Sequence, residues 1–142
     1  MNTKQSSQLT STNQLLTDLE KKKLAKTFLH AVGTQNWDLL HSIITEEISW
    51  TLPGTSLISG EVNGVNAIIT RAQQIASSGA SLELEYVLYG QYNVALFVHN
   101  QASRGELILD EHLATVCTIC NGKISKIETY VSDVDGVNAF FK

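Results

Sequence analysis

Cysteine, proline and basic charge are scarce in this sequence, and two of these shortages exclude whole classes of protein. The chain has two cysteines, and its polar start, MNTKQSSQLTST, contains no apolar segment, so we expect neither a signal peptide nor a membrane anchor. Without an export signal, the thiols are expected to stay reduced in the cytoplasm. The net charge of −4 argues against nucleic-acid binding, which normally requires a basic patch.

Motifs for a bound cofactor are also missing. Cys117 and Cys120 have CxxC spacing, but they fall inside a predicted strand, where residues three apart point to opposite faces. That geometry serves neither a zinc site nor a redox-active helix start. Gly60 and Gly64 are not followed by the GK[ST] of a phosphate-binding loop. We therefore predict no cofactor.

The remaining pattern predicts one domain over residues 13–142, preceded by a frayed polar tail over residues 1–12. Apolar residues at helical spacing predict three helices, the first capped by Ser11 or Thr12 and ended by Gly33. These helices cover residues 13–32, 37–44 and 64–78. β-rich runs predict strands over residues 47–52, 82–88, 92–100, 106–120 and 123–133. The only proline, Pro53, ends the first strand, and residues 134–141 are expected to dock as a last helical turn.

The two longest strands flank Asn121-Gly122, a pair typical of a type I′ turn because both central residues need positive φ. If the loop is these two residues, His112 lies opposite Val131, and Asp110 lies opposite Asp133. Opposed residues share a face of a sheet, as do residues two apart along a strand. We therefore predict that Asp110, His112 and Asp133 cluster beyond an apolar stretch as an acid–base site.

A second predicted hairpin turns at Gly90-Gln91 and places Tyr86, Phe97 and His99 on the core face. His99 lies just before a loop. It is therefore either a histidine at the edge of the core, bonded to a backbone carbonyl, or a polar group that lines a pocket.

Three segments carry a family resemblance: the helix end FLHAVGTQNWDLL, the strand and loop ISWTLPG with SGEVNGVNAI, and the closing hairpin CNGKISKIETYVSD. In their order and spacing, from about Leu15 onward, the chain resembles the nuclear transport factor 2-like (NTF2-like) superfamily, specifically its SnoaL-like, polyketide cyclase-like branch. The resemblance implies an α+β fold in which a curved antiparallel sheet wraps around three helices as a cone. It also implies an apolar pocket at the wide end and frequent homodimers through the outer sheet face.

The resemblance further implies a small apolar or carbonyl-containing ligand. In the cyclases an aspartate near the end of the last strand acts with a histidine on the neighbouring strand, and Asp133 and His112 resemble that pair. The usual aspartate position here holds Ser132, so Asp133 needs a bulge to face the pocket. Leu52 stands where ketosteroid isomerases carry their base, which disfavours that mechanism.

Two functions from different classes follow. The first is a lyase, isomerase or cyclase acting beside a carbonyl, with Asp133 or Asp110 as base and His112 as orienting group or donor. The predicted substrate-binding residues are His99, Tyr86, Trp50, Phe97 and Tyr130. The alternative is a binding or dimerisation module without chemistry, in which the aspartates cap turns and the histidine forms a rim ion pair. A metal held by the two aspartates and the histidine is a distant third, and we predict no metal site.

A homodimer is predicted from the other face of the last hairpin, which is also partly apolar. One chain has enough helix to cover only one face of the sheet, so an exposed apolar patch on the other face marks an interface. The residues of this predicted patch are Leu113, Thr115, Cys117, Ile119, Ile124, Glu128 and Tyr130.

Overall fold

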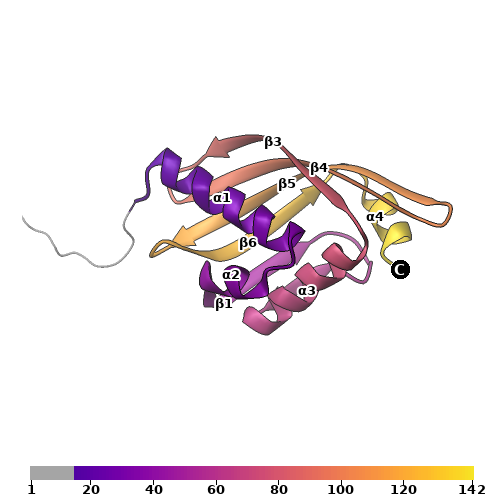
Figure 1. Ribbon diagram of the computed structural model, residues 1–142, viewed down its shortest axis with the longest axis horizontal. Helices are drawn as coiled ribbons and strands as arrows, with labels where there is room; N and C mark the ends of the chain where they lie inside the picture. Colours follow the sequence, from indigo (N-terminus) through magenta and orange to yellow (C-terminus); the bar gives the residue numbers. More distant parts are fainter. Residues whose placement is uncertain (1–14) are drawn as a thin grey trace, which may run out of the picture.

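A computed structural model describes residues 15–142 as a six-stranded curved sheet with helices packed on one face (Figure 1). The helices are α1 (Asp18–Gly33), α2 (Trp37–Ser42), α3 (Val65–Ser77) and α4 (Val134–Phe140). The strands are β1 (Ile44–Leu52), β2 (Gly60–Asn63), β3 (Ser81–Tyr89), β4 (Asn93–Arg104), β5 (Leu107–Cys120) and β6 (Lys123–Val131). The predicted α+β fold is confirmed. None of the described helices is long and apolar enough to span a membrane.

The first helix begins later than predicted. Thr17 caps it by accepting a hydrogen bond from the Glu20 N–H, and the Glu20 carboxylate accepts one from the Thr17 N–H, which makes a capping box. α1 therefore starts at Asp18, while the predicted caps, Ser11 and Thr12, lie outside the described residues. The predicted end at Gly33 is confirmed.

The sheet is mixed, with the strand order β2-β1-β6-β5-β4-β3. β1 runs parallel to β6, and the other neighbouring strands are antiparallel. The predicted antiparallel sheet therefore differs in two respects: Gly60–Asn63, for which no strand was predicted, forms the edge strand β2, and β1 runs parallel to β6. α1 contacts β3 and β4, and α3 contacts β1, so one face of the sheet is covered.

The last hairpin turns where predicted, but its strands are offset by one residue. Asn121 and Gly122 have φ of 52° and 80°, as a type I′ turn requires. A bulge then follows, because Ile119 pairs with Ile124 whereas Thr118 pairs with Lys126. Beyond the bulge, the residues of β5 that share a face with Val131 are the odd-numbered ones, and the prediction that His112 joins them was wrong.

The β3–β4 hairpin differs from its prediction for a similar reason. Its loop spans residues 90–92 instead of two residues, and Lys21 of α1 donates from Nζ to the carbonyls of Gly90 and Gln91. This tertiary contact holds the loop in its longer form. The longer loop makes Tyr86 pair with Phe97, and a bulge between Leu84 and Tyr86 turns Tyr86 to the face away from the helices, where Phe97 also lies. Their predicted position on the core face was wrong.

Candidate functional site

A cavity lies between the helices and the covered face of the sheet. Its volume is about 60 Å³, enough for a few waters or part of a small ligand. Most of its wall is apolar, with Phe28 of α1, Trp50 of β1, Leu113 of β5, Val131 of β6 and Phe141 after α4 among the lining residues. Trp50, one of the predicted substrate-binding residues, therefore lies in the wall of this cavity.

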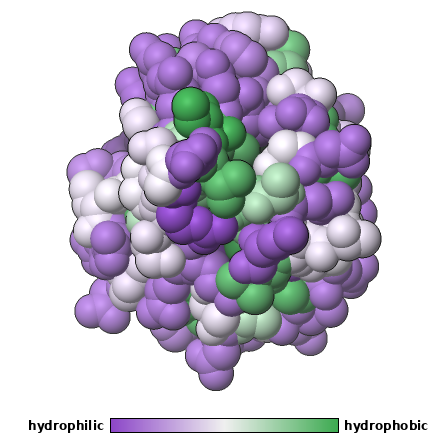
Figure 2. All heavy atoms as spheres, turned by 90° about the vertical axis from the view of Figure 1, so that its right-hand side faces the viewer, coloured by the Kyte–Doolittle hydropathy of each residue, from purple (hydrophilic) through white to green (hydrophobic). Residues whose placement is uncertain are grey.

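The end of the molecule that carries α4 faces the viewer in Figure 2, where hydrophobic side chains gather in patches among hydrophilic ones. Two exposed residues, Leu57 and Ile108, directly precede the lining residues Ile58 and Leu109 in the chain. The surface at this end of the molecule is thus partly apolar.

Glu111 and Asn100 are the most polar residues of the cavity wall. They face each other across β5 and β4, and their exposed fractions are 1% and 6%. Glu111 Oε2 and Asn100 Oδ1 are both buried without a hydrogen-bond partner. A buried acceptor without a partner costs about 1–3 kcal/mol, so this pair is a departure from ordinary core packing.

The other carboxylate oxygen of Glu111, Oε1, accepts three hydrogen bonds. Oε1 accepts hydrogen bonds from the backbone N–H groups of Ser132 and Asp133, the latter at 3.1 Å, and from the Ser132 hydroxyl at 3.2 Å. These three donors hold the carboxylate in one orientation and leave Oε2 toward the cavity. The prediction placed catalysis near Ser132 and Asp133, and the contribution of this segment is instead to bind Glu111.

Two threonines form a second polar strip in the cavity. Trp50 Nε1 donates to Thr129 Oγ1 at 3.0 Å, and Thr129 Oγ1 lies 3.2 Å from Thr115 Oγ1. Arg71 packs over the Trp50 ring and donates to the carbonyls of Trp50 and Ser59 at 2.9 and 3.0 Å. Burial lowers the pKa of Arg71 from its ordinary value. Within residues 15–142, both hydrogen bonds of the Arg71 guanidinium go to backbone carbonyls and none to a carboxylate.

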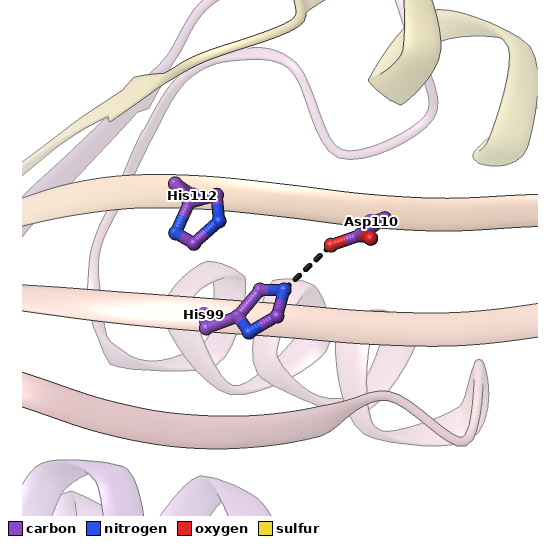
Figure 3. Close-up of side chains that lie close together, drawn as sticks. All are labelled: His99, Asp110 and His112. Carbon is purple, nitrogen blue, oxygen red and sulfur yellow. Dashed lines mark hydrogen bonds and ion pairs between the residues drawn. The ribbon is translucent and has the colours of Figure 1, made fainter.

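The predicted site residues His99, Asp110 and His112 do come together, but on the opposite face of the sheet (Figure 3). His99 Nε2 lies 2.5 Å from Asp110 Oδ1, and His112 Nδ1 lies 3.2 Å from Glu85 Oε1. The hydrogen bond to Asp110 raises the pKa of His99, and the charges of Asp110, Glu85 and Glu83 add to this.

Four other predicted site residues also lie away from the cavity. Asp133 is exposed and caps α4, accepting a hydrogen bond from the Gly136 N–H at 3.0 Å. Tyr86 stacks on Phe97 with 4.5 Å between the ring centroids, and Tyr130 is 57% exposed. The predicted convergence of Asp110, His112 and Asp133 on the pocket was therefore wrong, because the bulge in β6 reverses which residues of β5 face it.

The predicted dimer patch needs the same correction. Leu113, Thr115, Cys117, Ile119 and Ile124 belong to the covered face and the core, whereas Glu128 and Tyr130 lie on the outer face with side chains at least partly exposed. The single error of register thus exchanged the two faces of the hairpin.

Several proteins of known structure share this architecture. No protein-family model matches the sequence, and no curated protein matches it. Among solved structures, Bal32a from a soil-derived mobile gene cassette is 25% identical, covers 87% of this chain and 99% of its own, and has a TM-score of 0.78. An NTF2-like protein from Burkholderia xenovorans is 18% identical over 89% of this chain and 98% of its own, with a TM-score of 0.75. The chain has the NTF2-like fold.

A third solved structure with this fold is an LEH-like epoxide hydrolase from M. tuberculosis. It is 15% identical, covers 87% of this chain and 90% of its own, and has a TM-score of 0.69. The NTF2-like fold therefore carries differing sites, and the function must be argued from the residues of this chain.

The sequence did not predict Glu111 and Asn100 as site residues, although the structure places both in the cavity wall. Each lies one residue from a predicted site residue, Asp110 or His99, so the region was right and the face was wrong. One signal was present in the sequence: Val98, Asn100, Leu109, Glu111 and Leu113 form an alternating apolar stripe interrupted by two polar residues.

Proposed function

We propose that this chain binds a small, largely apolar carbonyl compound in the cavity and removes a carbon-bound proton from it, as a lyase, isomerase or cyclase of the SnoaL-like type. The observation that carries the proposal is the pair of buried oxygens without partners, Glu111 Oε2 and Asn100 Oδ1, in an otherwise apolar cavity. Such groups are costly in a structural role and are found at sites where a ligand completes the hydrogen bonding.

In this mechanism Glu111 is the general base. The carboxylate takes the proton from the carbon next to the carbonyl, and the electron pair of the broken C–H bond moves into the enolate. A half turn of the Asn100 side-chain amide presents its NH₂ group, which donates to the enolate oxygen. The protonated Glu111 then returns the proton to another carbon of the same substrate, which completes an isomerisation without a further reactant.

The fixed orientation of the Glu111 carboxylate supports its proposed role as general base. Its Oε1 is bound by two backbone N–H groups and one hydroxyl, so the carboxylate loses little freedom when a substrate arrives. The apolar walls exclude water, which strengthens each electrostatic interaction with the reacting atoms.

A binding module without chemistry is the second candidate. It is favoured by the lining itself: none of the residues that line the cavity, all within the described part of the chain, is a histidine or a tyrosine. Glu111 and Asn100 would then recognise a ligand that carries hydrogen-bond donors, and no bond would change.

Deuterium exchange separates these two functions. The protein is incubated in D₂O with a panel of cyclic ketones, and deuterium entry beside the carbonyl is followed by NMR. General-base catalysis contributes about 10²–10⁴-fold, so Glu111→Gln should slow the protein-dependent exchange by about 100-fold or more. Asp110→Asn is the matched control, because it removes the neighbouring carboxylate on the other face of β5.

Ligand binding is measured in the same samples by tryptophan fluorescence. Trp37→Phe leaves Trp50, a cavity residue, as the one tryptophan. The enzyme is supported if ligands quench the tryptophan fluorescence and if deuterium exchange is lost in Glu111→Gln but kept in Asp110→Asn. Quenching without exchange in the wild-type chain identifies the binding module. Equal exchange in the wild type and Glu111→Gln would remove Glu111 from the chemistry.

A homodimer through the outer sheet face also belongs to the proposal, now with corrected residues. Tyr86, Leu88 and Tyr130 point to that face and are 55%, 54% and 57% exposed. Sedimentation of the wild type and of Tyr130→Lys at several concentrations tests it, because a lysine there should weaken association. We further propose a cytoplasmic location, consistent with two free cysteines.

A further inference from the structure

The outer face of the sheet carries a compact group of metal-ligand side chains that the proposed function does not use. His99, Asp110 and His112 each present a ligand atom within 4.8 Å of the others. Figure 3 shows the three side chains above two neighbouring strands, with the His99 ring directed at Asp110. The cluster and the cavity lie on opposite faces of the sheet, since Asn100 and Glu111 alternate with these residues along β4 and β5.

The backbone holds this arrangement in place. His99 pairs directly with His112 across β4 and β5, both of which are interior strands, and Asp110 lies two residues from His112 on the same face. The two imidazole rings stack with 4.3 Å between centroids and 7° between planes, so each must rotate until a ring nitrogen points at a shared ion. Side chains on paired strands are positioned more precisely than side chains on loops, and a metal site requires such precision.

We propose that His99, His112 and Asp110 bind a divalent transition-metal ion, for which Zn²⁺ is the best match. Two imidazoles and one carboxylate are a donor set that suits Zn²⁺ and disfavours Mg²⁺ or Ca²⁺, which prefer oxygen ligands. Ligand atoms of a tetrahedral zinc site stand about 3.3 Å apart. To reach that spacing, the 2.5 Å distance between His99 Nε2 and Asp110 Oδ1 must lengthen slightly, and the longest distance between ligand atoms, which is at most 4.8 Å, must shorten. Rotation of the side chains can make both changes.

The surroundings favour a cation. Glu85 Oε1 contacts His112 Nδ1, the arrangement in which a carboxylate orients a ligating histidine through its other ring nitrogen. Glu83 pairs with His99 across β3 and β4 and adds negative charge. The side chains of Asp110 and His112 are 61% and 59% exposed, so an ion can reach them directly from solvent.

A bound ion would connect three strands on this face. His99 lies on β4, Asp110 and His112 lie on β5, and Glu85 lies on the edge strand β3. The ion is therefore assigned a stabilising role for the β3 side of the sheet, and the protein should melt at a higher temperature with Zn²⁺ than with EDTA.

The test is a calorimetric titration of the EDTA-treated full chain with ZnCl₂, followed by the visible spectrum of the Co²⁺-loaded protein. We expect about one ion per chain and the absorption of nitrogen-ligated, four-coordinate Co²⁺. Glu85→Gln should weaken Zn²⁺ binding by about 10–100-fold, as the loss of a histidine-orienting carboxylate does in other sites, and His112→Asn should weaken it further.

The chain offers a matched control in His41, which contacts Glu46 at 3.4 Å as an exposed histidine–carboxylate pair away from this cluster. His41→Asn should leave Zn²⁺ affinity unchanged. Absence of stoichiometric binding would overturn the proposal. So would equal losses in His41→Asn and His112→Asn, or Mg²⁺ binding as tight as that of Zn²⁺, because each would mean attraction by surface charge alone. Ring-proton NMR shifts at His99 and His112, with none at His30 or His41, would locate the ion.

Discussion

Replacing Thr129 with valine should destabilise the protein far more than the same change at Thr115, although the two hydroxyls touch. Both side chains are buried in the cavity wall, and valine has nearly the shape of threonine. Thr129→Val removes the acceptor of the buried Trp50 Nε1–H, which leaves a donor without a partner at a cost of about 1–3 kcal/mol. It also breaks the threonine–threonine bond, worth about 0.5–1.5 kcal/mol.

The expected loss for Thr129→Val is therefore about 2–3 kcal/mol. Thr115→Val breaks only the bond between the hydroxyls and leaves Trp50 satisfied, so its expected loss is about 1 kcal/mol or less. For a domain of this size, 1 kcal/mol corresponds to about 2–5 °C in Tm. Thr129→Val should thus melt about 4–15 °C below the wild type, and Thr115→Val within about 5 °C of it.

Urea unfolding followed by circular dichroism measures both free energies on the same scale. The two variants need the same slope against urea for the comparison to hold, because a changed slope signals a changed unfolded or native state. Equal destabilisation of the two variants would refute the argument, since it would mean that the Trp50 donor is not bound by Thr129. A loss confined to Thr115→Val would refute it as well.

Three further predictions concern the polar residues outside the cavity. Asp133→Ala should lower the free energy of unfolding by about 1 kcal/mol through loss of the α4 cap, while Asp133→Asn should lower it much less, as urea unfolding will show. Burial raises the pKa of Cys117 to about 12, so iodoacetamide at mildly alkaline pH should label the half-buried Cys120 and spare Cys117 in the native protein, as mass spectrometry will show. In EDTA, Asp110→Asn should lower the pKa of His99 measured by NMR, because the largest cause of its elevation is removed.

Each of these has a contrary outcome. Equal stability of the alanine and wild-type chains would mean that Asp133 does not cap α4. Labelling of Cys117 at the rate of Cys120 would show that β5 opens readily. Glu83 and Glu85 still face His99 after Asp110→Asn, so the fall in pKa should be partial, and an unchanged pKa would refute the hydrogen bond. Because the folded-state pKa of His99 is raised, its stabilisation is complete below the ordinary histidine pKa and is lost as pH rises through the folded one.

Local chemistry accounts for the parts of the structure that the sequence alone predicted. Asn121 and Gly122 form the predicted turn, and α1 ends at the predicted Gly33, although the left-handed residue after the helix is Gln35. The same holds for the capping box of Thr17 and Glu20, whose T-x-x-E pattern is visible in the sequence and predicts the start of α1 better than Ser11 or Thr12.

Which face of the sheet each strand residue occupies was decided by tertiary structure. Side chains alternate with a period of two, so one extra residue exchanges the two faces of everything beyond it. The bulge in β6 accompanies two contacts that short-range pattern does not reveal: Ile124 donates to the Ile43 carbonyl ahead of β1, and the Ser125 hydroxyl donates to the Thr118 carbonyl. The turn and most of the element order therefore follow from the sequence, whereas the position of Glu111 rather than its neighbour Asp110 on the cavity face follows from the packing of distant segments.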